Sequence, residues 1–331
     1  MQHVRQMLPV ALRLGQGVVM SRYPFMAAVN KFMNSYFGVY SEGTYKELQR
    51  RYPKIAKQLI ALEEKGKIAS TDPRKLTPED IKEYVLSQRA KGLKDGSINH
   101  DLGSLKNLCL YVSGNNCVET ARKQYPYMFV QKRRVRLPVT EKPEYNKLVK
   151  FANGLYPGGD PRVIRATAES MLAYCAGLRT QELQHSKVRN LDKDFRYIFL
   201  EHVKGMGTYG TARTVPIRPE IKHIMTVYLS IRDSDSEFIF PNKDGTYLST
   251  NALGVDRRIV EEEIGVRYDY RKARRTYAQY LIDEGFLVDE VAIILGHTSS
   301  RTTEAAYARP RDDRVVRKVI DAWENDLQKD K

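Results

Sequence analysis

The stretch ILGHTSSRTTEAAY occupies residues 294–307 and joins two short helical signals. An apolar run ends at Leu295, and Gly296 stops the helix, as glycine does at C-terminal caps. His297 follows at once, and the Glu-Ala-Ala triplet after the polar turn favours a second helix that carries Tyr307. A histidine and a tyrosine placed in this way suggest an oxygen nucleophile with a hydrogen-bonding partner. The pattern also fits a capping histidine and an ordinary half-buried aromatic residue.

The composition favours a polyanionic partner. Among 331 residues, 55 Lys and Arg stand against 40 Asp and Glu, which gives a net charge of +15. Nucleic acid is the first partner that such an excess predicts, and an anionic membrane surface is the second.

The length suggests about two domains. No apolar run is long enough for a membrane-spanning helix, and the three cysteines, at unrelated spacings, are expected to be reduced thiols of a cytosolic protein. No metal or cofactor motif is found, so no cofactor is predicted.

Helical signals dominate the first part of the chain. Residues 1–42 are interpreted as an N-terminal extension, part of which fits an amphipathic helix. The next segment, 44–67, reads as one helix or two helices interrupted by Pro53. Thr77 has the features of a helix cap, with proline after it and acidic residues in the first turn. Residues 43–129 are therefore predicted to be an all-helical domain.

A basic, proline-punctuated segment follows at residues 130–143 and is typical of an extended linker. Its charges fit either a solvated connector or contacts with phosphate groups. The predicted phosphate-contacting residues are Lys132, Arg133 and Arg134.

The remainder, 144–331, is predicted to be a second domain with mostly helical periodicity. Its strand signals lie at 197–203 and 213–217, on either side of a glycine-rich loop typical of a hairpin. The expected fold class is therefore mainly α with a small antiparallel β-hairpin.

Several groups that suit phosphate chemistry fall at element boundaries of this second domain. They are Arg179, Lys204, Arg271, Arg274, His297 and Tyr307. Arginine forks bind phosphate oxygens bidentately and stabilise extra negative charge in a transition state. A lysine can protonate a leaving oxygen, and a tyrosine oxygen can attack phosphorus. This set contains no carboxylate, and its composition suits the breaking of a phosphate diester without a metal ion. Lys204 could instead be a solvated residue, with Arg213 serving the same phosphate.

The motifs around these residues resemble those of the tyrosine recombinases, the phage-type integrases. AGLRTQEL at 176–183 resembles their first-arginine motif, and RKARRTYA at 271–278 resembles the middle motif, usually written HxxRHTFA. LGH at 295–297, followed by Tyr307, is similar to their second box, and Lys204 falls where the family has its catalytic lysine. Motifs in this order, with compatible spacing, are far more specific than any one of them alone.

The resemblance covers the catalytic half, about 143–327, and more weakly 70–120, which looks like the family's helical core-binding domain. It implies a two-domain clamp around double-stranded DNA at a specific attachment site. It also implies a homotetramer on DNA, a monomer or weak oligomer without it, no membrane partner, and a cytoplasmic, nucleoid-associated location.

The family implies a role for each matching position. Arg179 and Arg274 would clamp the scissile phosphate. Lys204 would protonate the leaving 5′ oxygen, and His297 would hydrogen-bond the phosphate or help to take the phenolic proton. Tyr307 would form a 3′-phosphotyrosyl bond to DNA.

Two positions depart from the family pattern. Arg271 stands where a histidine or lysine is usual, so it would bind phosphate or position another group; integrases of archaeal viruses and plasmids also vary here. Ten positions separate His297 from Tyr307, where the family commonly has about nine, and one extra residue turns a helix by about 100°. Rival tyrosines are Tyr209 and Tyr277.

Lys272 and Arg275 flank the second clamping arginine on the same predicted helix. They are expected to contact the DNA backbone or to be solvated.

The leading prediction is a site-specific DNA recombinase, an integrase. A type IB topoisomerase would use the same covalent chemistry on one duplex as a monomer. A DNA-binding protein that has kept the fold and lost catalysis is the alternative of a different class, with the excess of positive charge supplying non-specific affinity.

Overall fold

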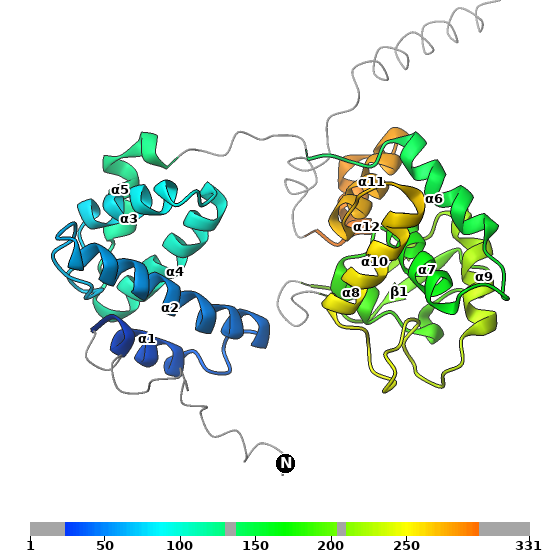
Figure 1. The fold of residues 1–331 in the computed structure, drawn as a ribbon, viewed down its shortest axis with the longest axis horizontal. Helices are drawn as coiled ribbons and strands as arrows, with labels where there is room; N and C mark the ends of the chain where they lie inside the picture. The colour runs from blue at the N-terminus through cyan, green and yellow to red at the C-terminus, as the bar shows by residue number, and fades with distance from the viewer. Residues whose placement is uncertain (1–23, 130–136, 204–209, 298–331) are drawn as a thin grey trace, which may run out of the picture. The chain divides into compact units, whose positions relative to one another are not determined.

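The chain forms two compact units, Met1–Arg133 and Arg134–Lys331 (Figure 1). The computed structural model describes residues 24–129, 137–203 and 210–297. Each unit has a hydrophobic core of its own. Among the helices in these described ranges, none has the length and apolar character needed to cross a membrane.

The described part of the first unit is built from helices alone. They are α1 (Pro24–Ser35), α2 (Glu42–Glu64), α3 (Pro78–Ala90), α4 (Asp95–Ser113), α5 (Cys117–Gln124) and the 3₁₀ turn η2 (Pro126–Met128). The predicted cap of α3 is confirmed: the Asp80 backbone N–H donates to the Thr77 hydroxyl, and the Asp80 carboxylate accepts from the Thr77 N–H. Gly114, with φ of 70°, ends α4 in the left-handed conformation that favours glycine.

α1 belongs to the core of the first unit, although residues 1–42 were interpreted as an extension. Phe25 and Phe32 are buried, and both rings pack against Tyr52 of α2. α2 is one continuous helix despite Pro53. Tyr52 and Ile55, on either side of the proline, are buried, so packing on both sides of it holds the helix together.

Replacing Phe25 with alanine should therefore destabilise the first unit by about 3–5 kcal/mol, the usual cost of removing a fully buried phenylalanine. Urea denaturation of the whole chain, followed by amide hydrogen exchange in α2 and α4, measures this cost. Phe37→Ala is the matched control, because the Phe37 side chain is 61% exposed. Equal, small effects of the two substitutions would show that α1 is an extension and not part of the core.

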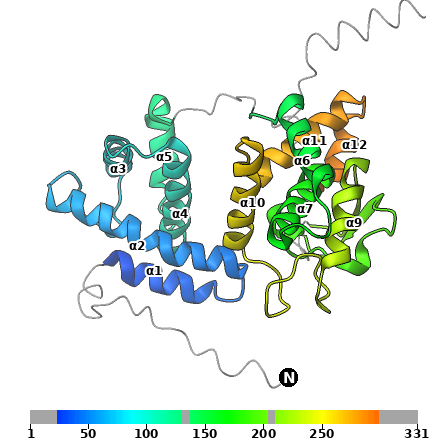
Figure 2. The same ribbon diagram turned by 45° about the vertical axis from the view of Figure 1, so that its right-hand side comes forward.

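The second unit surrounds α7 (Pro161–Ala176) with other helices (Figure 2). Every residue of α7 from Ala166 to Ala176 is buried. The other helices are α6 (Lys142–Gly154), α8 (Thr180–Gln184), α9 (Lys222–Ile231), α10 (Thr250–Ile264), α11 (Tyr270–Asp283) and α12 (Val288–Leu295), with 3₁₀ turns η3 (Val188–Asn190) and η4 (Pro219–Ile221). α7 contacts α6, α9, α10 and α11 directly, which makes it the centre of the unit.

Two antiparallel strands complete the second unit. β1 (Tyr197–Leu200) pairs with β2 (Arg213–Pro216), and the register places Leu200 opposite Arg213. Ile198 and Val215 face each other across this ladder and are buried in the core. The predicted fold class, mainly helical with a small antiparallel hairpin, is confirmed.

Candidate active site

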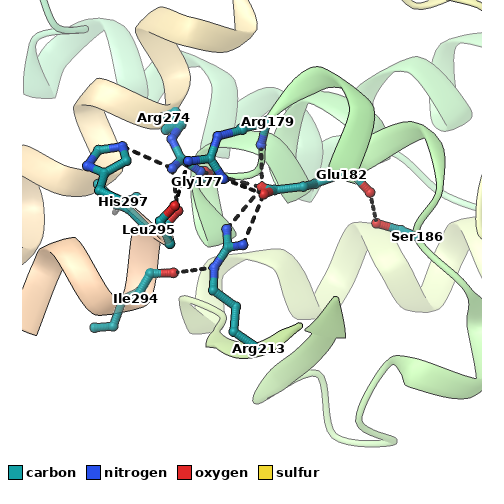
Figure 3. Close-up of polar contacts among 10 residues, drawn as sticks. Gly177, Arg179, Glu182, Ser186, Arg213, Arg274, Ile294, Leu295 and His297 are labelled. Carbon is teal, nitrogen blue, oxygen red and sulfur yellow. Dashed lines mark hydrogen bonds and ion pairs between the residues drawn. The ribbon is translucent and has the colours of Figure 1, made fainter. Parts of the chain in front are cut away.

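A buried carboxylate, Glu182, lies at the centre of a group of three arginines (Figure 3). The side chain of Glu182 is fully buried. It accepts from Arg179 at 2.6 Å, and it lies 3.0 Å from Arg213 and 3.5 Å from Arg274 in ion pairs. Burial disfavours the charged carboxylate, but the hydrogen bond from Arg213 and the charges of the three arginines outweigh it and lower the pKa of Glu182. The site therefore contains a carboxylate, contrary to the sequence prediction.

Local structure explains how Arg179 and Glu182 come together. Gly177, with φ of 61°, ends α7 and lets the chain turn into the short helix α8. Arg179 is the N-cap residue of α8, and its backbone N–H donates to the Glu182 carboxylate at 2.8 Å. An acidic residue in the first turn of a helix is also favoured by the helix dipole.

The same three arginines hold the carboxyl end of α12. Arg213 donates from Nε to the carbonyl of Ile294 at 2.8 Å, and Arg179 donates from Nη2 to the carbonyl of Gly296 at 2.8 Å. Arg274 donates from Nη2 to the carbonyl of Leu295 and from Nη1 to that of Gly177. The last carbonyls of a helix lack partners within it and carry partial negative charge, so cations are favoured there.

His297 follows directly on this anchored helix end. Gly296 has φ of 64° and turns the chain, and the His297 backbone N–H donates to the Ala292 carbonyl at 2.9 Å. The ring Nε2 lies 3.3 Å from Nη2 of Arg274. Because a guanidinium can only donate, Nε2 is the acceptor, and the proton of the neutral ring lies on Nδ1. Burial and the charges of Arg274, Arg179 and Arg213 lower the pKa of His297 to about 4.

His297 should therefore remain neutral well below the pH at which a solvated histidine becomes charged. In the DNA-free protein, NMR signals of its ring nitrogens should stay constant as the pH falls to about 5. In urea the same ring should titrate near the ordinary value of 6.5. Between pH 6.5 and 4 the ring is therefore protonated in the unfolded chain but neutral in the folded protein. Because only the unfolded chain gains this proton, the histidine lowers the stability of the fold as the pH falls through that range. A titration midpoint of the His297 ring near pH 6.5 in the folded protein would show that the neighbouring arginines do not lower its pKa.

The structure brings Arg179, Arg274 and His297 together, but it separates Arg271 from them. Arg274 is 5% exposed on α11, whereas Arg271, three residues earlier, is exposed to solvent. Neither a hydrogen bond nor an ion pair joins Arg271 to the arginine group in the described part of the chain. Both residues are predicted to act on the phosphate, but only Arg274 reaches the buried arginine group.

Lys272 and Arg275 border an open hollow of about 910 Å³ between α10 and α11. Arg275 donates to the carbonyl of Pro138 at 2.9 Å, and Lys272 donates to that of Arg267 at 3.4 Å. Further arginines line the same hollow, among them Arg257 and Arg258. Glu261, Glu262 and Asp269 line the hollow as well, so its five basic residues leave only a small positive excess at the predicted DNA-backbone contacts.

Some predicted site residues lie outside the described residues. They are Lys132, Arg133, Arg134, Lys204 and Tyr307, together with the rival Tyr209. The other rival, Tyr277, is buried on α11, and its hydroxyl donates to the carbonyl of Pro216 at 2.8 Å. Burial raises the pKa of the Tyr277 phenol, which disfavours the phenolate that an attack on phosphorus requires.

Comparison with known proteins finds a match to the family model described as "Phage integrase family" over residues 138–314. The chain is 26% identical over 245 residues to tyrosine recombinase XerC of Oceanobacillus iheyensis, which covers 69% of this chain and 75% of that protein. It is also 26% identical over 235 residues to tyrosine recombinase XerA of Pyrococcus furiosus, covering 69% of this chain and 75% of that protein.

Solved structures share the fold. The Tn1549 transposon integrase in complex with circular intermediate DNA superposes with a TM-score of 0.66 at 19% identity, covering 90% of this chain and 99% of that one. A lambda integrase tetramer bound to a Holliday junction has a TM-score of 0.60 at 15% identity, covering 87% and 79%.

Proposed function

The chain belongs to the phage integrase family, and we propose that it is a site-specific DNA recombinase that cuts and rejoins strands through a covalent bond between Tyr307 and a 3′ phosphate. Relatives at 26% identity carry the name tyrosine recombinase. The observation that carries the proposal furthest is the group of three arginines around one buried carboxylate, with the His297 ring beside Arg274.

The arginine group is suited to a phosphodiester. Three positive charges face one negative charge, so an excess of two positive charges remains while His297 is neutral. In the described structure, the side chain of Arg179 uses two of the five N–H donors of a guanidinium, for Glu182 and Gly296. Its side chain is 27% exposed, so an anion can reach the other donors. Glu182 fixes the guanidinium planes before the phosphate arrives, which favours stabilisation of the transition state.

His297 is suited to donate a hydrogen bond to the phosphate. Its Nε2 accepts from Arg274, so Nδ1 carries the proton that a phosphate oxygen can accept. With its pKa lowered to about 4, the ring is a weak base in the DNA-free protein. Of the two roles that the family implies, we therefore propose the donor role for this residue.

The proposed step exchanges one phosphate ester for another. The Tyr307 oxygen attacks phosphorus and its proton passes to water, the bond from phosphorus to the 5′ oxygen breaks, and Lys204 gives its proton to that leaving oxygen. The phosphorus stays bonded to the 3′ oxygen of the DNA and to the tyrosine. The reverse reaction, with a different 5′ hydroxyl, joins the new strand. The surrounding positive charge would help the phenol, whose unperturbed pKa is about 10, to lose its proton.

The partner is double-stranded DNA at a specific attachment site. We propose that four copies act together on two duplexes, that the protein is a monomer or weak oligomer without DNA, and that it acts at the nucleoid in the cytoplasm. The basic surface beside Lys272 and Arg275 would contact the DNA backbone, and Lys132, Arg133 and Arg134 would add phosphate contacts.

Covalent trapping tests the proposal. The protein is incubated in EDTA with sheared DNA from its source and with nicked duplexes from which the cut strand diffuses away. An SDS-resistant adduct, whose attached DNA has one sequence, is expected. Tight DNA binding without any adduct would favour a non-catalytic binder. Relaxation of supercoiled plasmids of any sequence would favour a type IB topoisomerase.

A further inference from the structure

Arg213 is the first residue of β2 and one of the three arginines around Glu182 (Figure 3). The sequence suggested it only as an alternative to Lys204 at the phosphate. Its side chain is 11% exposed. Nε donates to the carbonyl of Ile294 at 2.8 Å, Nη2 donates to Glu182 at 3.1 Å, and Nη1 lies 3.0 Å from the other oxygen of Glu182. All three nitrogens of the guanidinium are therefore directed at groups of the protein.

These contacts join three separate elements of the second unit. The backbone of Arg213 is paired with Leu200 in the hairpin, its fork holds Glu182 of α8, and its Nε holds the end of α12. A lysine could not make the same contacts, because the guanidinium presents its donors in a fixed plane, whereas an ammonium is a point charge.

Arg213 also lies flat against the turn that carries His297. A Cβ atom added to Gly296 would come within 2.7 Å of Nη1 and 2.8 Å of Cζ of Arg213. Gly296 therefore provides both the left-handed backbone, with φ of 64°, and the space for the guanidinium. The next residue along the chain is His297, so Arg213 packs against the residue that directly precedes the histidine.

We propose that Arg213 is a positioning residue, which fixes His297 against the arginine group by bracing the α12 end to Glu182 and to the hairpin. It acts on the histidine and does not bind the phosphate itself. The proposal rests on the proposed function, in which His297 contacts the scissile phosphate. The charge of Arg213 also contributes to the lowered pKa of His297.

The test compares Arg213→Ala and Arg213→Lys with the control Arg196→Ala in the full-length protein. Arg196 immediately precedes β1, its side chain is 65% exposed, and it pairs with Asp192 and Asp194 away from the site. Each variant is measured for binding of a nicked duplex, for the rate of adduct formation once DNA is bound, and for the NMR signals of the His297 ring. Thermal melts show which variants are folded.

We expect both Arg213 variants to bind DNA as well as Arg196→Ala does, and to form the adduct about 10–100-fold more slowly, the cost of a misplaced catalytic group. The His297 ring signals should move in both, and in Arg213→Ala the ring should also titrate at a higher pH. If Arg213→Ala is unfolded, the test relies on Arg213→Lys, because this variant keeps the positive charge and loses the planar set of guanidinium donors.

A cleavage rate in Arg213→Lys equal to that of the unsubstituted protein would overturn the proposal, since charge alone would then suffice. Unchanged His297 ring signals in that variant would overturn it as well. If the unsubstituted protein forms no adduct, the proposed recombinase function fails. The NMR comparison still decides whether Arg213 positions His297.

Discussion

Replacement of Arg274 by alanine should slow strand cleavage of bound DNA by about 10²–10³-fold, the usual effect of removing one donor that stabilises transition-state charge. Arg274 is 5% exposed and lies where Gly177, Leu295 and His297 meet. Its loss removes one proposed phosphate ligand and the partner of the histidine ring together. These two losses should lower the rate of the chemical step much more than the affinity for DNA, because DNA affinity comes from many phosphate contacts spread along the duplex.

Single-turnover adduct formation on a nicked duplex measures this effect, and binding is measured separately. Arg274→Lys should be nearly as slow as Arg274→Ala, since a lysine cannot donate to Gly177 and Leu295 at once. Arg196→Ala removes the same charge from an exposed position and should keep its cleavage rate. A rate in Arg274→Ala within threefold of that control would show that Arg274 is not part of the reaction centre.

Replacement of Glu182 by alanine should lower the free energy of unfolding by about 3–5 kcal/mol, the usual cost of breaking a buried ion pair. The positive charges of three guanidinium groups would lose the carboxylate that they share, and the backbone N–H of Arg179 would lose its acceptor. Thermal and urea melts of the full chain measure this cost. Glu201→Ala is the control, because Glu201 pairs with Arg189 and Lys187 at the surface, where the loss of a carboxylate should change stability little.

The stability that Glu182 provides should depend on pH in a defined direction. Its pKa in the folded protein is lowered below the ordinary 4.5, so the contribution is complete above pH 4.5 and is lost as the pH falls through the folded value. The difference in stability between the unsubstituted protein and Glu182→Gln should therefore shrink below pH 4.5. A difference that stays constant through this range would mean that Glu182 is not held as a carboxylate by the arginines.

Sequence patterns predicted the local features of this fold well. The helix at 288–295 and its end at Gly296 are confirmed, because an apolar run followed by glycine is a local signal. The antiparallel hairpin is confirmed for the same reason, since alternating residues on both sides of a glycine-rich segment define it. The cap at Thr77 depends only on residues within one turn of it.

The central role of Glu182 could not be predicted in this way. A spacing of three residues allows a local salt bridge with Arg179, but it does not reveal the other partners of Glu182. Arg213 and Arg274 reach it from distant parts of the chain, and only tertiary packing brings them together. Likewise, the sequence around Pro53 left open whether residues 44–67 form one helix or two, and packing on both sides of the proline decides for one. The motif match also could not show that Arg271 is exposed while Arg274, three residues later on the same helix, is buried.

The roles of Lys204 and Tyr307 remain predictions from sequence motifs. Ten positions separate His297 from Tyr307, one more than is common in the family. The nucleophile is therefore the claim for which a direct measurement matters most.

The most direct measurement is covalent trapping with Tyr307→Phe beside the unsubstituted protein, on the same nicked duplex and in EDTA. We expect an SDS-resistant adduct with the unsubstituted protein and none with Tyr307→Phe, while both bind the DNA equally well. Peptide mapping of the adduct should find the nucleotide on Tyr307. An adduct that persists in Tyr307→Phe would show that Tyr307 is not the nucleophile and assign that role to another residue.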